Sequence, residues 1–191
     1  MRKLIVTMWT TLDGFIADAS GEMDWLLADD QLADYEIAVV SNADTLLLGR
    51  KTYQDFVGYW PNVPSNPDAP EWERTYAAKI NALKKVVLST TLDRAEWDES
   101  EIRRDIDRDE IKALKNEPGK DILIYGSASV VQQLTNLGLI DEYQLVVHPV
   151  LLGSGRRLFD DIKQRVAVKL VESEPFSSGA LLLTYQLAGE R

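Results

Sequence analysis

Three short segments combine small residues, hydroxyl groups and cations in a pattern that suits a bound polyanion. They are Gly49-Arg50-Lys51-Thr52, Ser89-Thr90 and Tyr125-Gly126-Ser127-Ala128-Ser129. Small residues let a phosphate approach the backbone closely, and arginine binds phosphate through two parallel hydrogen bonds. Anion binding is therefore the chemistry that these residue types favour.

Each segment lies at the carboxyl end of an apolar run. These runs predict buried strands at 45–48, 85–90 and 122–125. Helical spacing follows at 49–58 and from Val130 onward. The carboxyl ends of parallel strands meet at one sheet edge, where ligands bind, and helix N-termini there favour anions. Ordinary alternatives stay open: a solvated Arg50-Lys51 pair, turn chemistry at Ser89-Thr90, and a structural corner in which Ser127 is an N-cap.

Bulk composition narrows the class of protein. The 191 residues fit one domain, 1–191, with 45% hydrophobic and 27% charged residues. A net charge of −10 argues against a nucleic-acid or anionic-membrane surface. No cysteine and one histidine exclude disulfides and thiolate or His-rich metal sites, so we expect no metal. No apolar run is long enough to span a membrane, and we expect a cytoplasmic protein.

The remaining pattern alternates strands with helices. It predicts strands at 4–9, 97–102 and 141–147, helices at 25–40 (capped by Asp24), 71–83 and 107–115, and loops at 10–24, 59–70 and 151–159. Two further strands, 166–174 and 181–187, form a terminal hairpin. The alternation predicts an α/β fold, with a largely parallel sheet covered on both faces and an antiparallel C-terminal hairpin.

The order of the motifs resembles a known family. Gly49-Arg-Lys-Thr52, Leu88-Ser-Thr90 and Ile124-Tyr-Gly-Ser127 follow one another as in dihydrofolate reductase. The segments Thr10–Ala17, Gly21, Asp24-Trp25 and Pro149–Gly155 look closer to stand-alone proteins similar to the C-terminal reductase domain of the riboflavin-biosynthesis deaminase/reductase. The resemblance covers nearly the whole chain and implies a three-layer α/β/α fold of about eight strands.

The resemblance also implies an activity, a reductase that transfers a hydride from NADPH to a small, pterin- or pyrimidine-like heterocycle. Arg50, Ser89 and Thr90 would then meet the 2′-phosphate, and Thr52 with Gly126 to Ser129 the pyrophosphate. The loop 12–25 would cover the nicotinamide, with Met8, Ile16 and Ala17 near its ring. Gly49, Lys51 and Tyr125 complete the predicted cofactor site.

The substrate side is less defined. Dihydrofolate reductases carry an acid on the first long helix, and this chain has four acids there: Asp29, Asp30, Asp34 and Glu36. The pattern does not choose among them, and the catalytic residue stays open. We expect Trp9, Asp13, Trp25 and Asp29 to contact the substrate. The His and Cys ligands of the companion zinc deaminase are absent. A non-catalytic NADP(H)-binding or interaction module is the alternative function.

Three other features have plainer interpretations. Arg156 and Arg157 indicate a surface turn, His148 a structural histidine, and Gly153-Ser-Gly155 lacks the following helix of a dinucleotide fingerprint. The apolar hairpin strands predict a homodimer, because Leu181-Leu182-Leu183 offers apolar side chains to both faces. Packing of these leucines beneath the Val130 helix of their own chain is the alternative.

Overall fold

The computed structural model describes residues 1–188, and the last three residues of the predicted domain 1–191 lie outside them. Within this range eight strands form one sheet, in the order β5-β4-β3-β6-β1-β7-β10-β9. Their bounds are β1 Leu4–Thr11, β3 Ala43–Gly49, β4 Lys84–Leu88, β5 Ser100–Arg103, β6 Asp121–Tyr125, β7 Glu142–His148, β9 Val168–Pro175 and β10 Leu181–Leu187. Only β10 runs against its neighbours, β7 and β9, so the predicted largely parallel sheet with an antiparallel C-terminal hairpin is confirmed.

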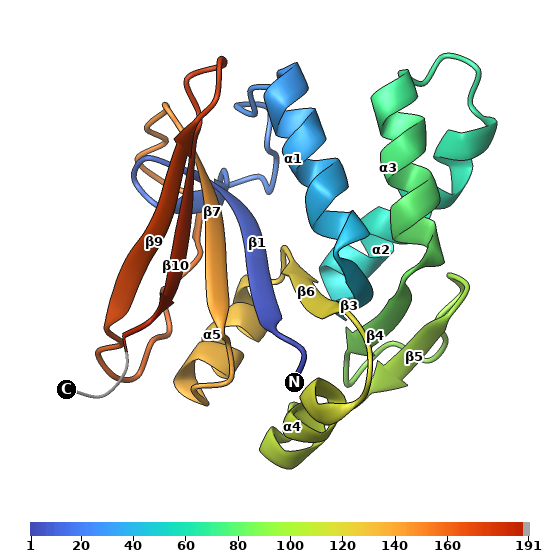
Figure 1. Cartoon of the computed structure of the whole chain (residues 1–191), viewed down its shortest axis with the longest axis vertical. Coiled ribbons are helices and arrows are strands. Elements are labelled where there is room, and N and C mark those ends of the chain that lie inside the picture. The colour runs from blue at the N-terminus through green and yellow to red at the C-terminus, as the bar shows by residue number, and fades with distance from the viewer. Residues whose placement is uncertain (189–191) are drawn as a thin grey trace.

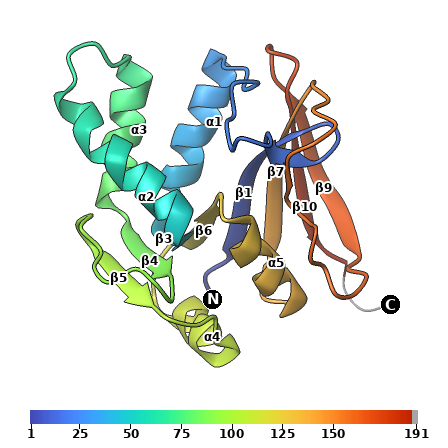
Figure 2. The same cartoon turned by 180° about the vertical axis from the view of Figure 1, so that it is seen from behind.

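Helices cover both faces of the sheet, as predicted. One face carries α1 Asp30–Ser41, α2 Arg50–Tyr59 and α3 Glu71–Ala82, and Figure 1 shows α1 beside α3. The other carries α4 Arg108–Asn116 and α5 Ala128–Asn136, and α5 lies in front of the sheet in Figure 2. Alternate strand residues feed two separate cores, with Leu47 packed toward α5 and Leu46 and Leu48 toward α3. None of the helices in residues 1–188 has the length and hydropathy to cross a membrane.

The predicted start of the first helix is wrong by five residues. Helix α1 begins at Asp30, because the carboxylate of Asp29 caps it by accepting the Leu32 N–H at 2.7 Å. The preceding segment is held by His148, whose ring meets the buried Trp25 edge-on at 5.3 Å and whose Nδ1 accepts the Leu27 N–H at 3.2 Å. Periodicity alone does not reveal contacts over such a sequence distance.

The three predicted loops all contain regular structure. A 3₁₀ helix, η1 Trp60–Ser65, begins within the proline-rich segment and tolerates proline in its first turn. Strand β2 Phe15–Ala17 pairs antiparallel with β8 Arg156–Arg157, joining loops that were predicted to be irregular. Gly155 permits this pairing, because a Cβ there would lie 2.2 Å from the Ala17 carbonyl oxygen. The edge strand β5 starts at Ser100, later than predicted.

The terminal hairpin only partly buries its apolar residues. Leu182 is 4% exposed and packs in a cluster with Leu32, Val146 and Phe176. It therefore packs against α1 of its own chain rather than beneath α5. Four residues of the hairpin strands stay 38–47% exposed: Val168, Leu170, Val171 and Leu187.

We predict that Asp29→Ala lowers stability at neutral pH, because Asp29 also accepts the Ser178 N–H at 2.6 Å and so ties α1 to the hairpin turn. These hydrogen bonds, led by that from Leu32, lower the pKa of Asp29 to about 2. The stabilisation is thus present above about pH 4 and is lost as the pH falls through 2. Thermal unfolding from pH 7 to pH 2 measures it. Asp30→Ala, the exposed neighbouring change, is the control, and equal melting of the two variants at pH 7 would contradict the cap.

Candidate functional site

A groove of about 510 Å³ lies where the carboxyl ends of the strands meet. It is lined by Gly49, Arg50, Lys51, Thr52, Leu88, Ser89, Thr90, Thr91, Arg104, Asp105, Ile106, Ser127, Ala128, Ser129, Val130, Gln133 and Arg156. The three segments singled out in the sequence therefore share one groove, as predicted from their positions at strand ends. The groove also takes residues from the β5–α4 loop and from β8.

Two strand–helix turns are joined at the centre of this groove. The Ser127 hydroxyl accepts the Gly49 N–H at 2.7 Å and donates to Thr52 Oγ1 at 2.9 Å. Ser127 and Gly126 both adopt left-handed backbone conformations, with φ of 57° and 55°. A Cβ on Gly126 would lie 2.6 Å from Thr52 Oγ1, so only glycine fits there. Ser127 does occupy the N-cap position of α5, as the alternative interpretation had it, but its hydroxyl bonds across the groove instead of capping the helix.

Both helices that start at this junction lack a side-chain cap. Neither Gly49 at α2 nor Ser127 at α5 hydrogen-bonds a first-turn N–H through its side chain. Free N–H groups and the helix dipole attract anions. The first turn of α2 also carries Arg50 and Lys51, which oppose the dipole at a cost of about 0.3–1 kcal/mol each. A bound anion would reverse that cost.

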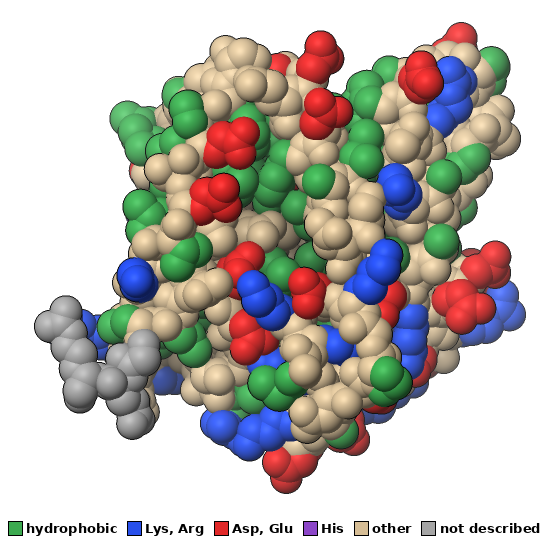
Figure 3. Space-filling model, in the orientation of Figure 1, with side chains coloured by type: hydrophobic (Ala, Val, Ile, Leu, Met, Phe, Trp, Pro, Cys, Tyr) green, Lys and Arg blue, Asp and Glu red, His purple; other side chains and the backbone are tan. Residues whose placement is uncertain are grey.

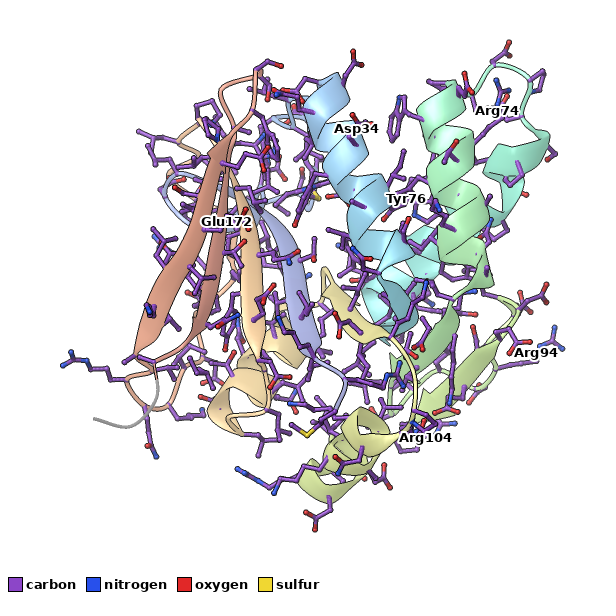
Figure 4. All side chains as sticks on the ribbon, in the orientation of Figure 1. Asp34, Arg74, Tyr76, Arg94, Arg104 and Glu172 are labelled. Carbon is purple, nitrogen blue, oxygen red and sulfur yellow. The ribbon has the colours of Figure 1, made fainter. Side chains whose placement is uncertain are left out.

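The outer wall of the groove is built around Ser89. Its hydroxyl accepts the Leu92 N–H at 2.9 Å, and its carbonyl oxygen accepts Arg104 Nη1 at 3.1 Å. Arg104 also donates to the Leu92 carbonyl at 2.7 Å, which holds the guanidinium beside this turn. Figure 4 shows Arg104 near the end of β5 and α4. Arg104 was not among the residues predicted from the sequence. It directly follows β5, so the argument that residues after parallel strands meet at one sheet edge applies to it as well.

Four cations therefore surround the groove: Arg50, Lys51, Arg104 and Arg156. Asp105 is the one acid among its lining residues. On the face shown in Figure 3, by contrast, basic side chains are scattered among acidic ones rather than gathered. The chain as a whole carries a net charge of −10. The groove is thus a local positive site on an acidic protein.

A second groove of about 510 Å³ between β5 and α4 has different chemistry. Its Arg103 is already paired with Glu101 at 2.7 Å and lies 3.9 Å from Glu110. Arg104 lines this groove too, but its two cations face three acids, Asp105, Glu110 and Glu117, so the first groove is the better anion site. The described residues hold no cluster of three His, Asp or Glu side chains placed to bind a metal.

Behind the junction lies a buried carboxyl group, Glu36 of α1, which is 4% exposed. Its oxygens accept Trp9 Nε1–H at 2.9 Å and the Tyr125 hydroxyl at 2.7 Å. Burial raises the pKa of Glu36 to about 7, although both hydrogen bonds lower it. Burial also raises the pKa of Tyr76, which Figure 4 shows between α1 and α3. Of the four acids considered on this helix, Glu36 is the one that the structure buries.

The other expected site residues lie outside the groove. Met8, Ile16 and Ala17 are buried, and the first two belong to the core that packs against α5. Tyr125 points its hydroxyl to Glu36 on the opposite side of β6.

The four expected substrate residues each make contacts of their own. Trp9 bonds Glu36, Trp25 meets His148 edge-on, and Asp29 caps α1. Asp13 accepts the Gly153 N–H at 2.8 Å, and so fastens two loops together. Trp9, Asp13 and Asp29 therefore use their polar groups in structural hydrogen bonds, whereas the buried Trp25 Nε1–H has no partner among the described residues.

Comparison with known proteins shows which family the chain resembles. Residues 2–182 match the model of the RibD C-terminal domain. The chain is 38% identical to the uncharacterized protein YyaP of Bacillus subtilis (strain 168) over 188 residues, which cover 98% of this chain and 96% of YyaP.

Solved structures share the fold. A putative riboflavin biosynthesis protein from Shewanella sp. PV-4 aligns with a TM-score of 0.77 and 24% identity over 97% of this chain and 99% of that one. A second structure is the Thermotoga maritima diaminohydroxyphosphoribosylaminopyrimidine deaminase/5-amino-6-(5-phosphoribosylamino)uracil reductase. It aligns with a TM-score of 0.67 and 16% identity over 98% of this chain and 57% of that one. Enterococcus faecalis dihydrofolate reductase, complexed with NADP(H), aligns with a TM-score of 0.62 and 20% identity over 97% of this chain and 96% of that one. The fold is therefore dihydrofolate-reductase-like, as the resemblance implied.

We predict that Glu36→Gln stabilises the protein more at pH 8 than at pH 5, in each case compared with the native protein. The pKa of Glu36 is about 7 in the folded protein against 4.5 ordinarily. The stability that it contributes is complete below about pH 4.5 and is lost as the pH rises through 7. Glutamine can still accept from Trp9 and donate to Tyr125 without ionising. The gain of the variant over the native protein should therefore grow by roughly 2.5 kcal/mol between these pH values.

Urea unfolding at pH 5 and pH 8 measures this gain. Asp34→Asn, an exposed change on the same helix, is the control and should not alter the pH dependence. The same pH dependence in Glu36→Gln and the native protein would show that Glu36 titrates normally.

Proposed function

The chain belongs to the RibD C-terminal domain family, and we propose that it is an NADPH-dependent reductase that transfers a hydride to a small heterocyclic acceptor. The observation that carries the proposal is the groove, in which two uncapped helix N-termini face one space with four cations. Such a site suits a ligand with several phosphates. We further propose that the protein acts in the cytoplasm as a single domain, residues 1–191.

The groove residues fit the phosphates of NADPH. Arg50, Ser89 and Thr90 lie on one side and would receive the 2′-phosphate, with Arg104 held beside Ser89. Thr52 and the turn 127–129 would receive the pyrophosphate, where Gly126 keeps the backbone open. When bound, NADPH supplies the hydride. The name of the Enterococcus dihydrofolate reductase structure, which includes NADP(H), supports this cofactor.

The acceptor follows from the family. The Thermotoga relative is named for reduction of a phosphoribosylaminouracil, and the Enterococcus relative for reduction of dihydrofolate. A pyrimidine- or pterin-like ring is therefore the proposed acceptor. Reduction by hydride also needs a proton, and Glu36 is the acid of α1 with a pKa of about 7. It would hold that proton next to Trp9 and Tyr125.

One observation favours a second candidate, a non-catalytic NADP(H)-binding module. The polar groups of the four expected substrate residues are engaged in structural contacts or buried, so no free acid marks a substrate pocket. Steady oxidation of NADPH at 340 nm in the presence of uracil- and pterin-type acceptors separates the two. Turnover with any of them would establish the reductase, and tight NADPH binding without turnover would establish the module.

We predict that the protein prefers NADPH to NADH and that Arg50→Ala removes this preference. A charge-assisted bond to the 2′-phosphate is worth roughly 1.5–3 kcal/mol, so affinity for NADPH should fall tenfold or more while that for NADH changes little. Fluorescence titration with each nucleotide measures both. Arg94→Ala is the control, because Arg94 is exposed and outside the groove. Equal affinities for the two nucleotides in the native protein would refute the assignment of Arg50.

We also predict a homodimer in which the exposed hairpin residues Val168, Leu170 and Leu187 meet a second copy. Light scattering at micromolar concentration should give twice the 21.5 kDa mass of one chain. Leu170→Glu should dissociate the dimer. Leu151→Glu, at an exposed leucine outside the hairpin strands, should leave it intact. A native mass near that of one chain would contradict the prediction.

A further inference from the structure

Two of the groove cations also touch the loop 12–25. Arg156 lies on β8, whose partner strand β2 belongs to that loop, with Arg156 opposite Ala17. Lys51 also lies against this loop, because a Cβ added to Gly21 would be 3.1 Å from Lys51 Nζ. The loop is therefore connected to the groove at two points by side chains that could bind the same anion.

The connection through Arg156 is stiff. The Gly155 backbone lies against the Ala17 carbonyl oxygen, and the Arg157 guanidinium stacks 4.4 Å from the Phe15 ring centroid. The Leu158 carbonyl accepts Gln132 Nε2 of α5 at 2.8 Å, which fixes this segment beside the helix. The backbone of Arg156 is therefore held together with β2 as one unit.

The charge on Arg156 has no carboxylate partner among the ion pairs of residues 1–188. Its side chain is exposed and lines the groove with the first turn of α5. A phosphate there would gain a charge-assisted hydrogen bond without first breaking an ion pair.

We propose, building on the function proposed above, that Arg156 is a further cofactor-binding residue that contacts the pyrophosphate and thereby positions β2 and its loop. The pyrophosphate would be the phosphate group held at the first turn of α5, whereas Arg50, Ser89 and Arg104 line the groove from α2, the end of β4 and the β5–α4 loop. Arg156 therefore acts on NADPH and NADH alike. Cofactor in the groove would thereby hold Phe15–Ala17 in place.

Affinity tests the contact. Arg156→Ala should weaken NADPH and NADH by a similar factor, tenfold or more, and Arg156→Lys should restore part of the loss. Arg165→Ala, another exposed arginine between β8 and β9, is the matched control and should bind normally. Unchanged affinity in Arg156→Ala would overturn the inference, as would a loss confined to NADPH.

Hydrogen exchange tests the positioning role. In the native protein NADPH should protect peptides of the groove turns, 49–52 and 126–129, and of the loop 12–24. In Arg156→Ala saturated with NADPH, the groove turns should stay protected and the loop should not. Retained protection of the loop would overturn the positioning role alone. Absence of NADPH binding to the native protein would refute the proposed function, and the inference with it.

Discussion

The groove depends on the hydroxyl of Ser127, which joins the two strand–helix turns that form its floor. Strands β3 and β6 are neighbours in register, with Leu47 opposite Ile124, so their turns reach the sheet edge at the same level. Ser127 accepts the Gly49 N–H and donates to Thr52, which fixes the starts of α2 and α5 relative to each other. Its left-handed backbone costs roughly 1–2 kcal/mol, and the two hydrogen bonds offset that cost. Neither helix then receives a side-chain cap, and their N–H groups remain available to a ligand.

Most of the sheet and the floor of the groove could be predicted from local sequence. Buried parallel strands are continuous apolar runs, and Gly49 and Gly126 mark where two of them end. Because parallel strands end at one edge, the residues that follow them had to meet, and Arg50, Ser89 and Ser127 do line one groove. This inference needed no knowledge of side-chain contacts, only the direction of the strands.

What the sequence did not reveal depends on contacts between distant segments. The segment before α1 is held by His148 against Trp25, and the β2–β8 pair joins Phe15 to Arg157. Neither leaves a periodic signal in either segment. Four acids on or beside one helix look alike in sequence, and only tertiary packing buries Glu36 while leaving Asp34 exposed.

The positions of the acids explain how an acidic protein can keep an anion site. The buried carboxyl group of Glu36 bonds the Tyr125 hydroxyl on the side of β6 opposite the groove and does not line the groove. Most other acids are exposed, and salt screens exposed charges beyond about 8 Å at physiological ionic strength. The net charge of −10 therefore acts weakly inside the groove. There the four nearby cations and two helix dipoles decide the sign of the potential.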